Sequence, residues 1–195
     1  MYNNSLFYLQ NRNDIITLTM WNGDEMNKLE KTVMFTGHRC QNLPFGFDET
    51  NSKCIKMKEI IKTQICELIE NEFAINFISG MAIGVDMICA EIVLELKKEY
   101  ANITLECAIP CESQPDRWSE PFKQRYYHIL NECDKKTILQ KEYTNDCMYK
   151  RNDYMVDKSD IVMAVWNGTK SGTGYTVEYA QKKGRRVFVL NPDKL

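Results

Sequence analysis

The chain has 195 residues, of which 44% are hydrophobic and 27% are charged, and its formal net charge is −2. This balance is typical of one globular domain, and it argues against non-specific nucleic-acid binding, which requires a strongly basic surface. No apolar run reaches the ~18 residues of a membrane span, and the N-terminus lacks a basic stretch followed by an apolar one, so we expect a cytoplasmic protein without a membrane partner.

Residues 1–30 show no clean periodicity and are interpreted as an N-terminal extension, whereas residues 31–195 are regularly patterned and predict the ligand-binding domain. In chain order, strands are predicted at 32–36, 73–78, 104–109, 137–139, 161–166 and 186–190. Helices are predicted at 53–72, around 85–96 and 122–130, at 146–158, and from the glycine-rich loop 168–174 to about residue 183.

The alternation of these elements predicts the fold class. In the first helix Met57, Ile61 and Ile65 recur at helical spacing, with lysine and glutamate on the other face. Strands that alternate with helices pair in parallel through right-handed crossovers. We therefore expect a three-layer, Rossmann-like α/β fold with a mainly parallel sheet, in which ligands bind beyond the carboxyl ends of the strands.

Three of the predicted strand ends carry glycine. Glycine lets the backbone approach a ligand closely, and a helix that begins just after it directs free N–H groups at an anion. The candidate ligand-binding residues at these ends are Thr36, Gly37, His38 and Arg39 after the first strand, Ser79, Gly80, Ala82, Gly84 and Asp86 after the second, and Gly172, Thr173, Gly174, Thr176 and Glu178 after the fifth.

These loops do not match the common nucleotide motifs. The chain contains neither a GxxxxGK[ST] phosphate loop nor a GxGxxG sequence, so no nicotinamide cofactor is indicated. Glycine is also common in ordinary turns between strands and helices. For each loop taken alone, the glycines could therefore have a purely structural role.

Each charged or aromatic residue near the strand ends could have either a ligand-binding role or a structural role. Arg39 and Arg151 could clamp a phosphate or lie in solvent, and His38 could contact the ligand or only complete a turn. Asp86 and Glu178 could act on a ligand or stabilise a helix N-terminus. Trp118 could be a core or cleft-wall residue, or, because it lies in a polar loop, it could stack on a base.

The eight cysteines include no Cys-x-x-Cys pair. Cys66, Cys89 and Cys107 fall inside apolar runs. Zinc sites need ligands at short spacing, so we expect no metal and no cofactor, and interpret the cysteines as reduced core thiols.

Residues 31–192 resemble the YpsA-like family of the SLOG superfamily, which is named for the DNA-processing protein DprA and the LOG enzymes. The stretch from Phe35 to Arg39 is similar to the first-strand signature of YpsA-like proteins. The stretch from Ser79 to Asp86 resembles the SGxARGID loop of DprA, with Ile83 in place of arginine.

The stretch from residue 148 to 178 is similar to LOG enzymes, which hydrolyse a nucleoside 5′-monophosphate to base and ribose phosphate. The chain keeps two residues of the LOG sequence MHxRK, Met148 and Arg151, and has Asn152 in place of the lysine. It keeps three residues of the LOG sequence PGGxGTxxE, which are Gly172, Gly174 and Glu178, and has Tyr175 in place of the threonine. The resemblance places Arg151 and Glu178 in one pocket, as the catalytic residues if the protein is an enzyme, with Asn152 among the ligand contacts.

The favoured hypothesis is a regulatory protein that binds a small nucleotide or a nucleotide derivative such as ADP-ribose. A nucleotide phosphoribohydrolase is the first alternative. A DprA-like single-strand nucleic-acid binder is the second, and the acidic balance and Ile83 argue against it. A homo-oligomer is compatible with all three.

Overall fold

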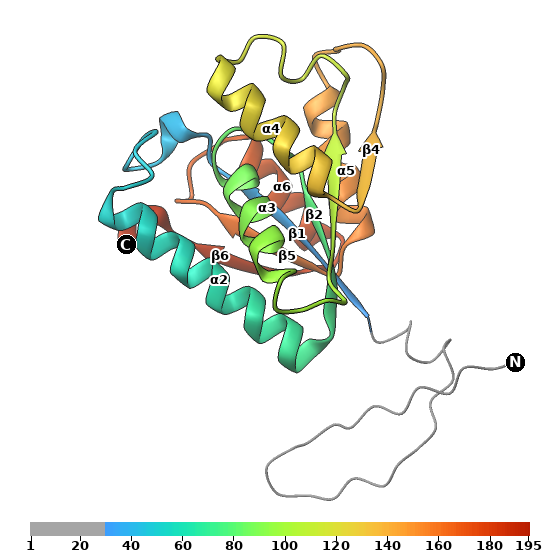
Figure 1. The fold of residues 1–195 in the computed structure, drawn as a ribbon. Coiled ribbons are helices and arrows are strands. Elements are labelled where there is room, and N and C mark those ends of the chain that lie inside the picture. Colours follow the sequence, from blue (N-terminus) through green and yellow to red (C-terminus); the bar gives the residue numbers. More distant parts are fainter. Residues whose placement is uncertain (1–29) are drawn as a thin grey trace, which may run out of the picture.

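The computed structural model describes residues 30–195, so residues 1–29 of the predicted extension lie outside the described part. Its centre is a six-stranded sheet with the order β4-β3-β2-β1-β5-β6, in which every neighbouring pair is parallel (Figure 1). The strands are β1 (Lys31–Gly37), β2 (Ala74–Ser79), β3 (Thr104–Ile109), β4 (Lys135–Ile138), β5 (Ile161–Val165) and β6 (Arg186–Leu190).

Helices cover both faces of this sheet. The helices are α2 (Ser52–Glu72), α3 (Val85–Leu96), α4 (Glu120–Glu132), α5 (Cys147–Lys158) and α6 (Gly172–Lys182), with short 3-10 turns η1 (Cys40–Asn42) and η2 (Pro192–Lys194). Helix α3 packs against α2 and α4 on one face, and α5 packs against α6 on the other (Figure 1). This confirms the predicted three-layer, Rossmann-like architecture.

The strand order reverses between β1 and β5. From β1 the chain moves outward through β2, β3 and β4, and it then returns to place β5 on the other side of β1. In parallel α/β sheets the crevice at such a reversal is where ligands bind. The topology therefore directs attention to the loops that follow β1, β2 and β5.

Alternation along the central strands builds the core on both sides of the sheet. Val33 and Phe35 of β1 point into the larger apolar cluster under α2, α3 and α4, whereas Met34 points into the smaller cluster under α5 and α6. The rings of Phe35 and Phe77 stack with their centroids 6.0 Å apart. Because these strands are buried on both faces, they appear in the sequence as continuous apolar runs.

Several strand boundaries differ from the sequence prediction by one or two residues, and two of these differences have a clear structural reason. Phe73, expected to open the second strand, instead ends α2 in the left-handed conformation (φ 55°) and donates its backbone N–H to Leu68. The fourth strand begins at Lys135 rather than at residue 137. As an edge strand it exposes polar side chains, so its first residues carry no apolar signal.

The described residues contain no cluster of three or more histidine, cysteine, aspartate or glutamate side chains that could hold a metal ion. No helix among them combines the length and the apolar character that crossing a membrane would need.

Candidate functional site

The end of β1 packs directly against the start of α3. A Cβ atom added to Gly37 would lie 2.5 Å from Cβ of Val85, so only glycine permits this approach. Gly84 has a φ of 111°, and a Cβ there would lie 2.8 Å from the carbonyl oxygen of His38. These two glycines bring the ends of β1 and β2 together, and the protein itself fills the space beside them.

Ser79 closes the loop between β2 and α3. Its hydroxyl donates to the carbonyl oxygen of Asp86 at 2.7 Å and accepts the backbone N–H of Met81 at 3.2 Å. Met81 is buried and lies in the left-handed region with a φ of 57°. A non-glycine residue in this region costs free energy, so the surrounding contacts hold the loop in this shape.

Gln114 supports the same loop from the segment after β3. Its side-chain amide donates to the carbonyl oxygens of Gly80 and Met81, both at 3.2 Å, and its own oxygen accepts the Tyr126 hydroxyl at 3.4 Å. Sequence reasoning missed Gln114, because a polar residue between two prolines looks like a surface loop. Its burial depends on the tertiary structure.

A buried ion pair lies behind this loop. The Nη1 atom of Arg151 from α5 lies 3.3 Å from Oδ2 of Asp86, and the two residues are only 4% and 6% exposed. The guanidinium occupies the space beside Gly80, where an added Cβ would lie 1.5 Å from Nη1. Gly80 therefore makes room for Arg151, and the pair joins the start of α3 to α5.

The charges at this pair do not balance. Burial raises the pKa of Asp86, and the nearby Arg151 and Arg39 oppose this shift. Burial also lowers the pKa of Arg151, and the positive charge of Arg39 lowers it further despite Asp86. Among the described residues, the buried Nε atom of Arg151 has no hydrogen-bond partner. Two guanidinium groups thus lie near one carboxylate, and one buried donor is left free.

The end of β5 completes this edge of the sheet. Across the strand reversal, Nε2 of His38 lies 2.8 Å from Oδ1 of Asn167, whose amide nitrogen donates to Asp193 at 3.0 Å. Helix α6 then begins at Gly172, with the hydroxyl of Ser171 accepting the backbone N–H of Gly174 at 3.1 Å. No atom lies within 4 Å of a Cβ placed at Gly172, so this helix start is open.

Residues 33–195 match the sequence family YpsA, described as the YspA SLOG family. The chain belongs to this family. It is 33% identical over 157 residues to the uncharacterized SPbeta prophage-derived protein YoqJ of Bacillus subtilis, covering 73% of this chain and 92% of that protein. It is 30% identical over 158 residues to a UPF0398 protein of Bacillus thuringiensis, covering 79% of this chain and 84% of the relative.

The fold of this YspA SLOG protein is similar to a solved structure of DNA processing protein A from Helicobacter pylori. The TM-score is 0.56 at 20% identity, and the match covers 86% of this chain and 68% of that one. At this identity the similarity concerns the fold alone.

In this SLOG domain the remaining predicted residues lie around the central pair in different ways. Asn152 donates its amide to the hydroxyl of Thr176 at 2.8 Å and so joins α5 to α6. The half-buried Trp118 packs edge-on against Tyr126, with ring centroids 5.3 Å apart. Glu178 is exposed on α6, and within the described part of the chain no hydrogen bond joins it to Arg151. Thr36, Ala82 and Thr173 are buried at the same edge.

Tyr149 and Tyr175 are aromatic candidates that sequence reasoning passed over. They come from α5 and α6, close to the start of each helix, and they pack edge-to-face with centroids 4.9 Å apart. Their exposed fractions are 46% and 36%. Tyr149 stands at the position of the histidine in the LOG sequence MHxRK, and Tyr175 at the position of the threonine in PGGxGTxxE. These two replacements were the sequence signal that could have identified them.

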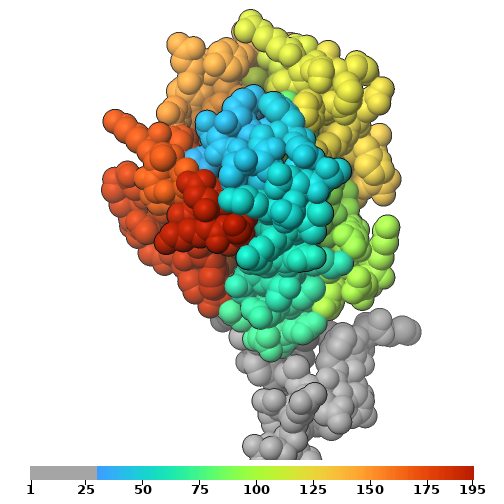
Figure 2. All heavy atoms as spheres, turned by 90° about the vertical axis from the view of Figure 1, so that its left-hand side faces the viewer, coloured from blue at the N-terminus to red at the C-terminus, as the bar shows by residue number. Residues whose placement is uncertain are grey.

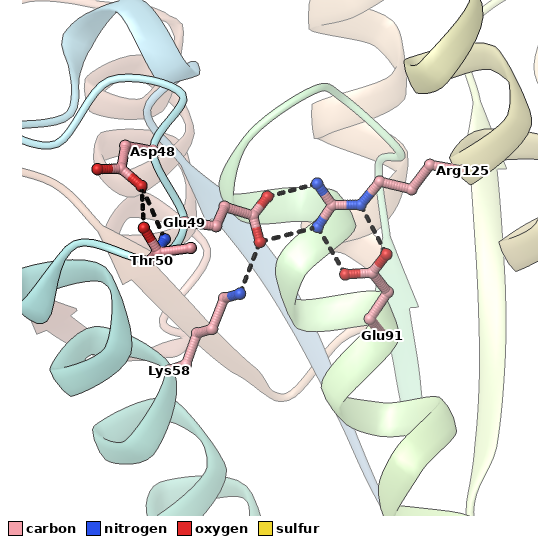
Figure 3. Close-up of polar contacts among 6 residues, drawn as sticks. All are labelled: Asp48, Glu49, Thr50, Lys58, Glu91 and Arg125. Atoms are coloured by element: carbon pink, nitrogen blue, oxygen red, sulfur yellow. Dashed lines mark hydrogen bonds and ion pairs between the residues drawn. The ribbon is translucent and has the colours of Figure 1, made fainter.

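A polar network holds the segment between β1 and α2 over the strand ends. Arg125 of α4 donates from Nε and Nη2 to Glu91 of α3, both at 2.6 Å, and from Nη1 to Glu49, while Lys58 of α2 donates to Glu49 at 2.6 Å (Figure 3). In Figure 2 the segment (blue) lies between the C-terminal residues (red) and the region of α4 (yellow). The network therefore connects three helices to a loop at the candidate site.

Replacing Arg125 with methionine should lower the free energy of unfolding by about 1–2 kcal/mol. This is the contribution of hydrogen bonds between charged groups, reduced because the groups are partly exposed to solvent. Although burial raises the pKa of Glu49, hydrogen bonds from Arg125 and Lys58 lower it overall. The contribution is then present above the ordinary pKa of glutamate and is lost as the pH falls through the lowered value. Urea unfolding at neutral and acidic pH measures both effects.

The matched control is Lys62→Met, which removes a more exposed ion pair with Glu95. This change should leave the free energy of unfolding nearly unchanged, because Lys62 is exposed to solvent. Equal losses for Lys62→Met and Arg125→Met would contradict a bracing role for Arg125.

Proposed function

We propose that this domain binds a nucleotide or a nucleotide derivative, such as ADP-ribose, at the edge where β1, β2 and β5 end. The observation that carries the proposal is the presence of two arginines there, with Arg39 and Arg151 near the carboxylate of Asp86. A phosphate group would add negative charge beside them, and arginine binds phosphate with charge-assisted hydrogen bonds.

The start of α6 supplies the second part of the proposed phosphate contact. Free backbone N–H groups and the helix dipole favour an anion at this position, and the open space at Gly172 leaves room for one. His38, Thr36 and Thr173 would line the sugar. The base would stack on Tyr175 or on Trp118, which lie on opposite sides of the sheet edge.

We favour binding without catalysis, and therefore a regulatory role. In a phosphoribohydrolase a carboxylate must stabilise positive charge at the sugar carbon, but Glu178 is exposed, and among the described residues no hydrogen bond joins it to Arg151. Incubation with AMP should therefore release no adenine. Release by the wild type that is lost in Glu178→Gln would favour the enzyme instead.

DNA processing protein A of Helicobacter pylori binds single-stranded DNA. A sugar and a phosphate are common to nucleotides and nucleic acids, so the same edge could contact either. The net charge of −2 and the presence of Ile83 favour the small ligand. An oligonucleotide that binds more tightly than ADP-ribose at physiological salt would reverse this preference.

Replacing Gly172 with alanine should weaken ADP-ribose binding about tenfold, or ~1.4 kcal/mol, because the new methyl group would displace a phosphate from the helix N-terminus. Isothermal titration calorimetry with ADP-ribose, AMP, ribose 5-phosphate and adenosine measures this. Compounds with phosphate should bind, and adenosine should not.

The melting temperature of Gly172→Ala should equal that of the wild type or exceed it, since the site is open and alanine favours helices. Arg39→Ala should weaken the same compounds without lowering stability, because Arg39 is partly exposed and makes no ion pair in the part of the chain that the structure describes. Unchanged affinity in both variants would reject the proposed phosphate position.

A further inference from the structure

The two edge strands of the sheet differ in what protects them from other chains. On β4 the side chains of Lys135 and Lys136 are exposed. On β6 the residues from Val187 to Leu190 include no charged residue and no proline, and their register with β5 is uninterrupted. Proteins usually protect an edge strand from pairing with another chain by charged residues, proline or bulges. The outer edge of β6 lacks these protections from Val187 onwards.

Backbone groups on the outer side of β6 are available for pairing. Toward β5, Arg186 donates its N–H to the residue just before that strand, and Leu190 accepts an N–H from the residue just after it. The backbone groups of alternate residues point to opposite sides of a strand, so those of Val187 and Val189 point away from β5. Within residues 30–195 no strand lies on that side of β6.

An apolar groove lies beside the same strand, on the face of the sheet that α2 covers. Its volume is about 150 Å³, and its lining includes Ile60 and Ile61 of α2, Met163 of β5, and Phe188 and Leu190 of β6. Ile60 is 38% exposed. In Figure 2 the C-terminal residues (red) lie beside α2 (turquoise). An apolar strand edge and an apolar groove are therefore neighbours on one side of the molecule.

We propose that β6 is the surface through which two copies of this chain associate, with β6 of one copy pairing antiparallel to β6 of the other in one continuous sheet. A pairing centred on Phe188 places Val187 of each copy opposite Val189 of the other. The two copies are related by a twofold axis perpendicular to the sheet. This axis keeps the two α2 helices on the same face, so α2 of each copy approaches the groove of the other.

A second copy fits this surface better than an unrelated strand. A pair of five-residue strands is small beside the ~1,200 Å² that a stable interface buries, so a further contact is needed. A second copy supplies that contact, because it carries its own α2 with the exposed Ile60 on the required face. An isolated strand from another protein would leave the groove open.

The distribution of charge along the edge favours the antiparallel direction. Arg185 and Arg186 stand at the beginning of β6, and the exposed Asp193 follows its end. Antiparallel pairing brings the basic end of each strand toward the end that carries Asp193 in the other copy. Parallel pairing would place the arginines of the two copies side by side, and like charges at such positions are destabilising.

Sedimentation equilibrium of the full-length protein at micromolar concentrations tests the proposal. The wild type should be a dimer, and Val189→Lys should raise the dimer dissociation constant at least tenfold by placing a charge on the shared edge. The matched control is Ile138→Lys on the β4 edge, since Ile138 and Val189 are both 50% exposed. The control should leave the dissociation constant unchanged. A monomeric wild type, or equal effects of the two variants, would overturn the proposal.

Amide hydrogen exchange of the wild type, followed residue by residue by NMR, gives a second test that needs no variant. The N–H groups of Val187 and Val189 should exchange at least tenfold more slowly at concentrations where the dimer forms than after dilution. The N–H groups of Arg186 and Phe188, which face β5, should show no such dependence. A dimer in which Val187 and Val189 exchange at the rate seen in the monomer would place the interface elsewhere and reject the pairing.

Discussion

Replacing Arg151 with methionine is expected to lower the free energy of unfolding by about 3–5 kcal/mol, the cost of leaving one member of a buried ion pair without its partner. The stranded group is Asp86, which is 6% exposed. Among residues 30–195 its carboxylate then keeps only a long hydrogen bond from the backbone N–H of Ala82, at 3.4 Å. The sequence alone allowed Arg151 to line an open cleft, where its loss would hardly change stability. Its burial reverses that expectation.

The loss should depend on pH. Burial already raises the pKa of Asp86 in the wild type, and removing Arg151 takes away the strongest opposing influence. A carboxyl group whose pKa is raised on folding contributes stability that is present below its unfolded pKa and lost as the pH rises through the folded value. Arg151→Met should therefore be least destabilised in mild acid and most destabilised at neutral and alkaline pH.

Urea unfolding between mild acid and pH ~8 checks this result, with the exposed Arg117→Met as the matched surface control. Adding Asp86→Asn to Arg151→Met removes the stranded charge and should restore part of the stability and abolish the pH dependence. A deficit that is the same at every pH would show that the loss comes from packing, and not from Asp86.

Replacing Gly84 with alanine should cost about 3 kcal/mol or more, since backbone strain and overpacking each contribute ~1–3 kcal/mol. The φ of 111° is one that alanine rarely adopts, and its Cβ would lie 2.8 Å from the backbone oxygen of His38. Backbone atoms cannot rotate away as a flexible side chain can. The variant should either unfold at a much lower temperature or separate the ends of β1 and β2.

Gly46→Ala is the control that isolates the contact from the dihedral angle. Gly46 has a φ of 58°, and no atom lies within 4 Å of its added Cβ, so only the left-handed conformation opposes alanine, at about 1 kcal/mol. Thermal unfolding of the two variants measures the difference. Equal losses would mean that the close approach of the two loops does not contribute to stability.

Much of the fold follows from local sequence patterns. The apolar repeat of α2 and the continuous apolar run of β5 have the periods of a helix and of a strand buried on both faces, and the alternation of such elements leaves few topologies other than a parallel, three-layer sheet. The same patterns place the glycines after β1, β2 and β5 at one edge, because the carboxyl ends of parallel strands share an edge. The weakest predictions were at Phe73, an exposed apolar residue that directly precedes β2, and at β4, where the sequence carries no apolar alternation.

Only the tertiary structure decided what the residues at this edge do. The sequence does not distinguish the structural roles of the glycines. Gly84 avoids a collision with the backbone of His38, Gly80 makes room for the guanidinium of Arg151, and Gly172 faces open space. Arg151 and Asp86 are 65 positions apart and come from α5 and α3. The burial, pairing and pKa of a side chain depend on neighbours that the crossovers between strands bring together. The sequence by itself therefore determined which side chains reach this edge of the sheet. The packing determined which of them are free to bind a ligand.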